Sequence, residues 1–305
     1  MTKEHKEHNF HGLFFTIVVF ILVLAGGARG HSQREQIRQA DRISGVISRD
    51  NILAKAVVIP DLISKRGALL VKVTESAILT PSISGISALV QEIGIIKPVF
   101  SFNSQKQWSA ASLAKLVTAV VAIENLSSDQ IIKVSPAAIA TESSAGNLVS
   151  GKSYPLMDLL RVMMVFSSND AAVAIAEHFG KENFVSMMNK KASEMGMSNT
   201  RFFDSSGLSP LDLTTAEDLN RLVNYIFTRH INLLTLSQEK IEGATHPFAG
   251  YSNFIGGKTG FIDEAGGNLV SLFNYRNRAF AVIVLGSKQR AEDTEILSDW
   301  FLVDN

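Results

Sequence analysis

The chain contains no cysteine, which excludes disulfides, thiolate metal ligands and cysteine nucleophiles together. It has no excess of either charge, because 29 Lys and Arg residues balance 29 Asp and Glu residues. It also lacks a block of basic residues, so a nucleic-acid partner is not predicted. Apolar residues, in contrast, make up 46% of the 305 residues, enough for one sizeable domain with a large buried core.

The longest uncharged apolar run lies close to the N-terminus. Residues 13–25 read LFFTIVVFILVLA, and with weak interruptions the run extends over residues 10–28, about the length that crosses a bilayer. The small residues Ala25-Gly26-Gly27-Ala28 equally suit cleavage by signal peptidase. The arginines that follow the run oppose the positive-inside rule for an exported C-terminal part, so the flanking charges do not decide between the two.

This run sets the expected organisation of the chain. We expect residues 1–28 to form a hydrophobic helix that is a signal peptide or a membrane anchor, with membrane contact through residues 10–28 if it is not cleaved. Residues 29–80 are expected to be a tether or N-terminal extension, and residues 81–305 to be the functional domain. Both interpretations of the leader predict an extracytoplasmic location, in the periplasm or at the cell surface. His5, His8 and His11 recur in the leader without other ligands to complete a metal shell, so no metal site is predicted.

The order of predicted strands and helices indicates an α+β domain. A hairpin is predicted at 86–91 and 97–102, and two late strands at 268–273 and 279–285. Helices are predicted between them at 112–124, 156–166, 170–179, 182–195 and 214–227, and a last helix at 291–301. Thr214 and Glu217 have the spacing of a capping box. We therefore expect one antiparallel sheet built from both ends of the domain, with a helical subdomain in between.

The first of these helices carries a candidate nucleophile and base. Ser112 lies at its N-terminus, where negative charge is favoured, and Lys115 follows one turn later on the same face. Burial in an apolar helix, together with a second cation at Lys258, would lower the pKa of Lys115 and make it a usable base. The same spacing occurs at Ser237 and Lys240 in a polar stretch with no further motif behind it, so spacing alone does not identify the pair.

Two later motifs complete a possible catalytic set. Ser167-Ser168-Asn169 falls between two predicted helices, where it can face a cleft or cap the next helix. Lys258-Thr259-Gly260 directly precedes the late strands and is expected to be a cationic strand that can grip a carboxylate. Gly257-Lys258-Thr259 also looks like the end of a Walker A loop, but that loop needs a glycine at the position of Ser252 and should open a helix. The set predicts acyl transfer through a serine ester without histidine, next to a free carboxylate.

Residues 86–301 resemble the low-molecular-weight penicillin-binding proteins, specifically the serine D-alanyl-D-alanine carboxypeptidase family. The resemblance rests on the three motifs and extends to segments such as Ser206-Gly207-Leu208 and Asn268-Leu269-Val270. It implies a β-lactamase/transpeptidase-like fold, a peptidoglycan peptide as substrate, β-lactams as covalent inhibitors, and neither metal nor organic cofactor.

The resemblance also implies the catalytic roles. Ser112 attacks the carbonyl of the penultimate D-alanine, which releases the terminal D-alanine and leaves an acyl-enzyme that water hydrolyses. Lys115 takes the serine proton. Ser167 relays a proton toward the leaving amine, and Lys258 keeps the local field positive.

The binding roles follow from the same resemblance. Asn169 hydrogen-bonds the peptide backbone of the substrate, while Lys258 and Thr259 hold its terminal carboxylate. Gly260 completes that motif, and the backbone N–H groups of Ser112 and Phe261 form the oxyanion hole, each worth on the order of 3 kcal/mol.

Three alternative functions remain open at this point. An endopeptidase that cuts D-amino-acid cross-links would use the same site. A class A β-lactamase needs a loop glutamate, and the corresponding interval offers Asp204 instead. A non-catalytic wall-binding module would keep the fold, although all six polar motif positions are intact. The chain departs from the family at Ser168, where glycine is usual, and we expect that side chain either to narrow the cleft or to alter the choice of substrate.

Overall fold

The computed structural model describes residues 56–57, 72–73, 80–142 and 145–304. The chain divides into two units, Met1–Thr80 and Pro81–Asn305. In the first unit, strand β1 (Ala56–Val57) pairs antiparallel with β2 (Lys72–Val73). The predicted N-terminal helix and most of the predicted tether lie outside the described residues. Within the described part of the chain, no helix combines the length and the apolar character needed to cross a bilayer.

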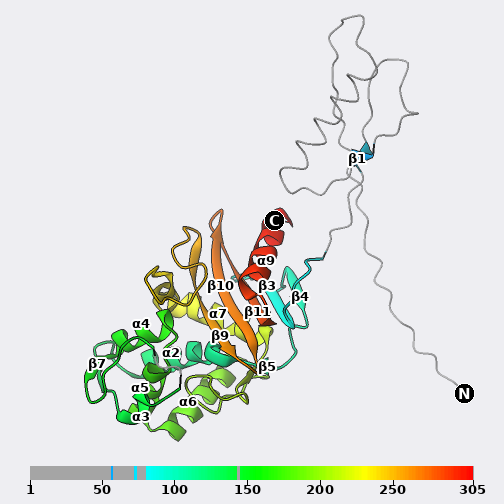
Figure 1. Ribbon diagram of the computed structural model, residues 1–305. Coiled ribbons are helices and arrows are strands. Elements are labelled where there is room, and N and C mark those ends of the chain that lie inside the picture. Colours follow the sequence, from blue (N-terminus) through cyan, green and yellow to red (C-terminus); the bar gives the residue numbers. More distant parts are fainter. Residues whose placement is uncertain (1–55, 58–71, 74–79, 143–144, 305) are drawn as a thin grey trace, which may run out of the picture. The chain divides into compact units, whose positions relative to one another are not determined.

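The second unit is built on a five-stranded antiparallel sheet with the order β4-β3-β11-β10-β9 (Figure 1). The strands are β3 (Ser87–Glu92), β4 (Phe100–Phe102), β9 (Phe254–Ile262), β10 (Gly266–Tyr275) and β11 (Arg278–Ser287). The early strands β3 and β4 therefore join the late strands in one sheet, as predicted from the sequence.

Two strands differ from the prediction. Strand β4 begins at Phe100, three residues later than expected, since Pro98 cannot donate a ladder hydrogen bond. The strand expected at Lys258-Thr259-Gly260 was predicted without bounds; in the structure it is β9, which spans nine residues and precedes the two late strands. Glycines disfavour strands, and β9 contains three of them, so its sequence does not indicate where the strand begins and ends.

Each face of the sheet packs against helices. On one face, Val90 and Val284 belong to the same core cluster as Leu297 and Phe301 of α9 (Arg290–Asp304). The neighbouring residues Leu89 and Ile283 face the opposite side and join the larger core. This alternation follows the two-residue period of a strand and places the sheet between α9 and the remaining helices (Figure 1).

The helical part lies between β4 and β9 in the sequence. Its main helices are α2 (Ala114–Asn125), α4 (Leu156–Val165), α5 (Asn169–Phe179), α6 (Lys181–Glu194) and α7 (Ala216–Arg229). Shorter elements are β5 (Trp108–Ser109), η2 (Ala111–Leu113), β6 (Ile131–Lys133), α3 (Pro136–Ile139), β7 (Ser153–Pro155), β8 (Leu213–Thr214), α8 (Ile231–Thr235) and η3 (Leu236–Gln238). The first nine residues of α2 are all buried, so this helix forms the centre of the domain.

The start of α7 corrects the predicted capping box by one residue. Its N-cap is Thr215, whose hydroxyl accepts a hydrogen bond from the Asp218 N–H at 3.0 Å. Thr214 instead pairs with the Thr200 hydroxyl at 2.9 Å, because it belongs to strand β8. The first residue able to cap is therefore the one after the strand ends.

Candidate active site

Ser112 lies on the 3₁₀ turn η2 at the entrance to the buried helix α2. The preceding residue, Ala111, has a φ of 47°, a left-handed conformation that is costly for a residue with a Cβ. The turn is held from the sheet, where the Asn268 side-chain amide donates to the carbonyls of Ser109 at 2.8 Å and Ala110 at 3.1 Å. The Ala110 N–H in turn donates to the Asp212 carbonyl at 2.7 Å. The nucleophile therefore stands on a strained turn that its neighbours fix in place.

Lys115 is completely buried and its amine touches three oxygen atoms. Nζ lies 2.8 Å from Ser112 Oγ and 2.6 Å from Asn169 Oδ1, and it donates to the Ser206 carbonyl. One helical turn separates Lys115 from Ser112, as the sequence predicted, but the other two contacts come from distant segments. The amine is thus placed to exchange a proton with the serine hydroxyl.

Burial lowers the pKa of Lys115 to about 7. The charges of Asp204, Asp212 and Asp170 oppose this shift and pull the pKa back up. Lys258 was expected to contribute to the lowered pKa, but the charges that act most on Lys115 are these aspartates. The amine is therefore poised between its two protonation states at neutral pH.

Ser167 and Lys258 form the second polar pair. Lys258 Nζ donates to Ser167 Oγ at 2.7 Å and to the Thr259 carbonyl at 2.8 Å. Burial holds the pKa of Lys258 well below its usual value, and repulsion from Lys115 and Arg290 lowers it further. Ser167 itself has a φ of 60°, so its hydroxyl is presented on a second left-handed residue.

Ser168 and Asn169 open helix α5. Ser168 is the N-cap, since its hydroxyl accepts from the Ala171 N–H at 3.1 Å, and the residue is fully buried. The expectation that Ser168 narrows the cleft is therefore wrong: its side chain turns back to the helix. Asn169 donates to the Glu142 carbonyl at 2.7 Å with its amide nitrogen, while its oxygen accepts from Lys115.

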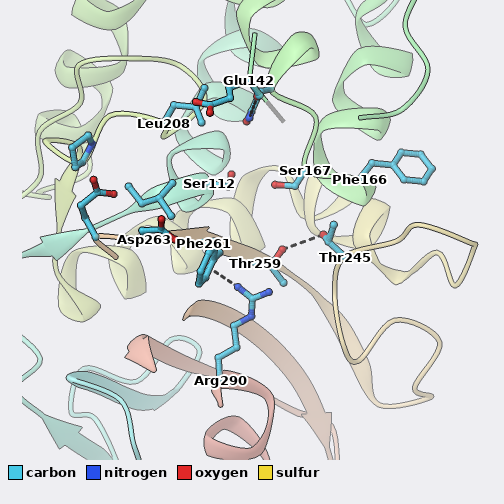
Figure 2. A pocket seen from close by; sticks show the side chains of 15 residues that line it. Ser112, Glu142, Phe166, Ser167, Leu208, Thr245, Thr259, Phe261, Asp263 and Arg290 are labelled. Atoms are coloured by element: carbon cyan, nitrogen blue, oxygen red, sulfur yellow. Dashed lines mark hydrogen bonds between the residues drawn. The ribbon is translucent and has the colours of Figure 1, made fainter. Parts of the chain in front are cut away.

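These groups surround a cleft of about 620 Å³ (Figure 2). Six of the eight predicted site residues line it: Ser112, Ser167, Asn169, Thr259, Gly260 and Phe261. The two lysines, Lys115 and Lys258, do not line the cleft and lie beneath Ser112 and Ser167. Each cation is therefore reached from the cleft through a serine hydroxyl.

Gly260 brings the edge strand up against the nucleophile. A Cβ atom on Gly260 would lie 3.1 Å from the Ala110 oxygen and 3.3 Å from the Ser112 nitrogen. A side chain at this position would have to push β9 away from Ser112. The next residue, Phe261, is 61% exposed at the rim of the cleft. This close approach is what the predicted oxyanion hole between Ser112 and Phe261 requires.

Three residues of the site carry no motif and were not predicted from the sequence. Arg290, at the start of α9, lines the cleft and donates to the Gly260 carbonyl at 2.6 Å (Figure 2). Asn268 holds the turn before Ser112, and Asp212 anchors the same turn through its backbone. Asn268 appeared in the sequence only as one of the matching segments, and nothing in the local sequence singles out the other two.

The described residues contain no group of three His, Cys, Asp or Glu side chains that could hold a metal ion. The histidines of the leader lie outside these residues. The site therefore offers hydroxyl, amine, amide and backbone groups, which are the groups that acyl transfer uses.

The sequence profile of the D-alanyl-D-alanine carboxypeptidase family matches residues 74–289. The chain belongs to this family of serine peptidases. The match confirms the resemblance to the low-molecular-weight penicillin-binding proteins that the motifs indicated. Membership also makes the chain a D,D-peptidase by family, without fixing which D-alanyl bond it cuts.

Several relatives within the D,D-peptidases are similar in sequence. The D-alanyl-D-alanine endopeptidase of Pseudomonas aeruginosa is 32% identical over 65% of this chain and 70% of that protein. The D-alanyl-D-alanine endopeptidase of Escherichia coli is 28% identical over 72% of this chain and 78% of that protein.

Solved structures of penicillin-binding proteins share the fold. A D-alanyl-D-alanine carboxypeptidase from Mycobacterium tuberculosis has a TM-score of 0.68 at 22% identity, covering 74% of this chain and 94% of that one. Penicillin-binding protein 6B from Escherichia coli has a TM-score of 0.65 at 27% identity, covering 72% and 78%. The transpeptidase-like fold expected from the sequence is confirmed for the described domain.

Proposed function

We propose that the chain hydrolyses the D-alanyl–D-amino-acid bonds of peptidoglycan peptides through an acyl-enzyme on Ser112. The specific reaction that we propose is release of the terminal D-alanine from a stem peptide. The observation that carries this proposal is the contact of 2.8 Å between the buried Lys115 amine and the Ser112 hydroxyl. A serine next to an amine that is half deprotonated at neutral pH is an activated nucleophile.

Acylation starts when the neutral amine of Lys115 takes the Ser112 proton as Oγ attacks the D-alanine carbonyl. The resulting oxyanion faces the backbone N–H groups of Ser112 and Phe261, and its collapse breaks the C–N bond. The departing amine takes a proton through Ser167, which relays the proton that Lys115 took from Ser112, so that Lys115 becomes neutral again; Lys258 keeps the local field positive. Water then hydrolyses the ester, with Lys115 returning as the base that activates it.

A second candidate reaction is cleavage of D-amino-acid cross-links between stem peptides. Relatives from Pseudomonas aeruginosa, Escherichia coli and Haemophilus influenzae are named D-alanyl-D-alanine endopeptidases. Others from Bacillus subtilis and Escherichia coli are named carboxypeptidases. Both reactions break a bond from the same D-alanyl carbonyl, so one site serves either, and the group on the leaving amine distinguishes them.

The same site should accept β-lactams as covalent inhibitors. Penicillin-binding protein D2 from Listeria monocytogenes, which has a TM-score of 0.64 and 25% identity, was solved in a cefotaxime-bound form. The β-lactamase alternative is less well supported, because the Asp204 carboxylate lines a different cleft from Ser112. We also propose an extracytoplasmic location, with residues 10–28 as anchor or cleaved signal, since that is where peptidoglycan lies.

The decisive experiment is intact mass spectrometry of the full chain, kept in detergent, after incubation with benzylpenicillin. The wild type should gain the mass of one intact penicillin, and Ser112→Ala should gain none. Folded wild-type protein that gains no mass would support a non-catalytic module and overturn the proposal. Fast hydrolysis of benzylpenicillin by the wild type would instead support the β-lactamase function.

Peptide assays then separate the two reactions. A stem pentapeptide and a cross-linked peptide dimer are incubated with wild type, with Ser112→Ala as the control. Release of D-alanine from the pentapeptide identifies a carboxypeptidase. Conversion of the dimer to monomers, with the pentapeptide left intact, would assign the endopeptidase reaction instead.

A further inference from the structure

We propose that Asp204 is the positioning residue for the base of this reaction: its carboxylate folds residues 204–209 into a turn that aims the Ser206 carbonyl at the Lys115 amine. This inference rests on the proposed function, because it concerns how Lys115 acts on Ser112. Asp204 does not line the substrate cleft; it acts on Lys115 through the turn and through its charge.

The geometry around Lys115 explains why the Ser206 carbonyl matters. A neutral amine has two N–H bonds and one lone pair, and Lys115 Nζ has three oxygen neighbours. Two of these neighbours, Asn169 Oδ1 and the Ser206 carbonyl, can only accept. They therefore take both N–H bonds, and the lone pair is left to point at Ser112. Without the Ser206 carbonyl, the amine could turn an N–H toward the hydroxyl and would not act as a base.

Asp204 places this carbonyl through four hydrogen bonds. Its Oδ1 accepts from the Ser206 N–H at 2.6 Å, the Ser206 hydroxyl at 2.8 Å and the Gly207 N–H at 2.7 Å. Its Oδ2 accepts from the Ser209 N–H at 2.6 Å. These four hydrogen bonds, all from the five residues after Asp204, fix the conformation of the turn strongly, because charge-assisted hydrogen bonds are about twice as strong as neutral ones.

The turn is also fitted closely to the nucleophile. Gly207 has a φ of 80°, and a Cβ atom there would lie 1.9 Å from the Ala111 carbonyl oxygen. In the same turn, the Ser205 carbonyl accepts from the Thr118 hydroxyl at 2.7 Å, which ties the turn to helix α2. A shift of the turn would therefore move both the acceptor of Lys115 and the backbone next to Ser112.

Asp204 has a second effect on Lys115 through its charge. The charged groups that face the amine are Asp170 at the start of α5, Asp204 and Asp212 from the 204–212 segment, and Lys258 from β9. Among them Asp204 is the largest influence that raises the pKa of Lys115. Asp212 contributes less charge at neutral pH, because burial and repulsion from Asp204 raise its own pKa to about 7.

The test is Asp204→Asn, which keeps the side-chain size but removes the charge and puts an amide donor opposite the Ser209 N–H. We measure the rate constant for acylation by benzylpenicillin from about pH 5 to about pH 9, by intact mass. The variant should acylate about 10- to 100-fold more slowly, because small misplacements of a base cost that much. Its acidic midpoint should also move to lower pH than in the wild type, because a negative charge beside Lys115 is lost.

The matched control is Asp218→Asn. Asp218 is fully buried, whereas Asp204 is partly buried, and it organises another loop, accepting from the Asn199 N–H at 2.9 Å and the Thr200 hydroxyl at 2.8 Å. It has no contact with Lys115, so its loss should lower the melting temperature and leave the acidic midpoint at the wild-type value. An Asp204→Asn variant with the wild-type midpoint, or a midpoint shift of the same size in Asp218→Asn, would overturn the inference.

A second variant and the wild-type adduct make the result interpretable even if Asp204→Asn does not fold. If Asp204→Asn does not fold, Asp204→Glu keeps the charge while displacing the carboxylate, and it should acylate slowly with the wild-type midpoint. A wild-type rate in that variant would overturn the inference. Failure of the wild type itself to form the adduct would instead contradict the proposed function, so the two failures are distinguishable.

Discussion

Two serine–lysine pairs with identical spacing end in opposite surroundings. Ser112 and Lys115 lie at the start of α2, where the amine is fully buried and contacts the serine hydroxyl at 2.8 Å. Ser237 lies on the short turn η3 and is buried as well, but Lys240 is exposed to solvent. The Ser237 hydroxyl donates to the Leu234 carbonyl at 2.7 Å and accepts from the Gly257 N–H at 2.8 Å.

The difference shows that the three-residue spacing between a serine and a lysine is not sufficient to make the lysine a base. What turns Lys115 into a base comes from segments far along the chain: the amide of Asn169, the carbonyl of Ser206 and the packing that excludes water. Lys240 has no such neighbours, and the hydroxyl of Ser237 is used to hold strand β9 in place. A catalytic serine–lysine pair is therefore a property of the assembled domain.

Removal of each lysine gives the largest expected contrast. Lys115→Ala should slow acylation by benzylpenicillin about 10³-fold or more, since nucleophile and base act as a unit. Lys240→Ala should leave the rate unchanged, because an exposed side chain far from the cleft contributes nothing to it. Adduct formation followed by intact mass gives both rates. A fast Lys115→Ala variant would mean that another group is the base.

The pH dependence of acylation sharpens the same contrast. Because burial lowers the pKa of Lys115 to about 7, the amine is protonated and inactive at lower pH and becomes available as pH rises through that value. The acylation rate of the wild type should therefore rise with a midpoint near pH 7. A lysine with the ordinary pKa of about 10.4 would place the midpoint more than three units higher, and that result would contradict the assignment.

The smallest effect concerns Ser237. Ser237→Ala leaves the Gly257 N–H without its partner inside the protein, which should lower the free energy of unfolding by about 1–3 kcal/mol. Acylation should stay within a few-fold of the wild type, because Ser112 and Lys115 are untouched. Chemical denaturation measures the first quantity and adduct formation the second. Loss of acylation with full stability would assign Ser237 a catalytic role that its position does not support.

Much of the fold and the site could be predicted from the sequence. The late strands are short, mostly apolar runs bounded by polar residues, and the buried helix is apolar on nearly every side, so both gave strong local patterns. The eight motif residues were recognised because their order along the chain repeats that of a known family. The structure gathers all eight around one cleft, six on its surface and two beneath it.

The parts that could not be predicted depend on contacts that have no local pattern. Strand β9 is held by its neighbour β10 and contains glycines that disfavour strands, so the motif indicated a strand but its bounds could not be predicted. Asp204 and Arg290 act through backbone groups of other residues, and nothing in the adjacent sequence marks such contacts. The side chain of Ser168 was placed in the cleft because capping and cleft-lining positions are indistinguishable before the helix start is known.

The position of β9 at the edge of the sheet limits which mutations can weaken the binding of an inhibitor. One side of the strand pairs with β10, and its residues from Thr259 onward line the cleft beside Ser112. A ligand that lies along this strand is held by main-chain groups, which almost every amino-acid replacement leaves in place. Only proline removes an N–H, and Gly260 admits no larger residue without displacing the strand. Mutations that weaken an inhibitor at this edge must therefore act through side chains at the rim of the cleft, such as Phe261 on β9 and Leu208, while the main chain of the strand stays a fixed target.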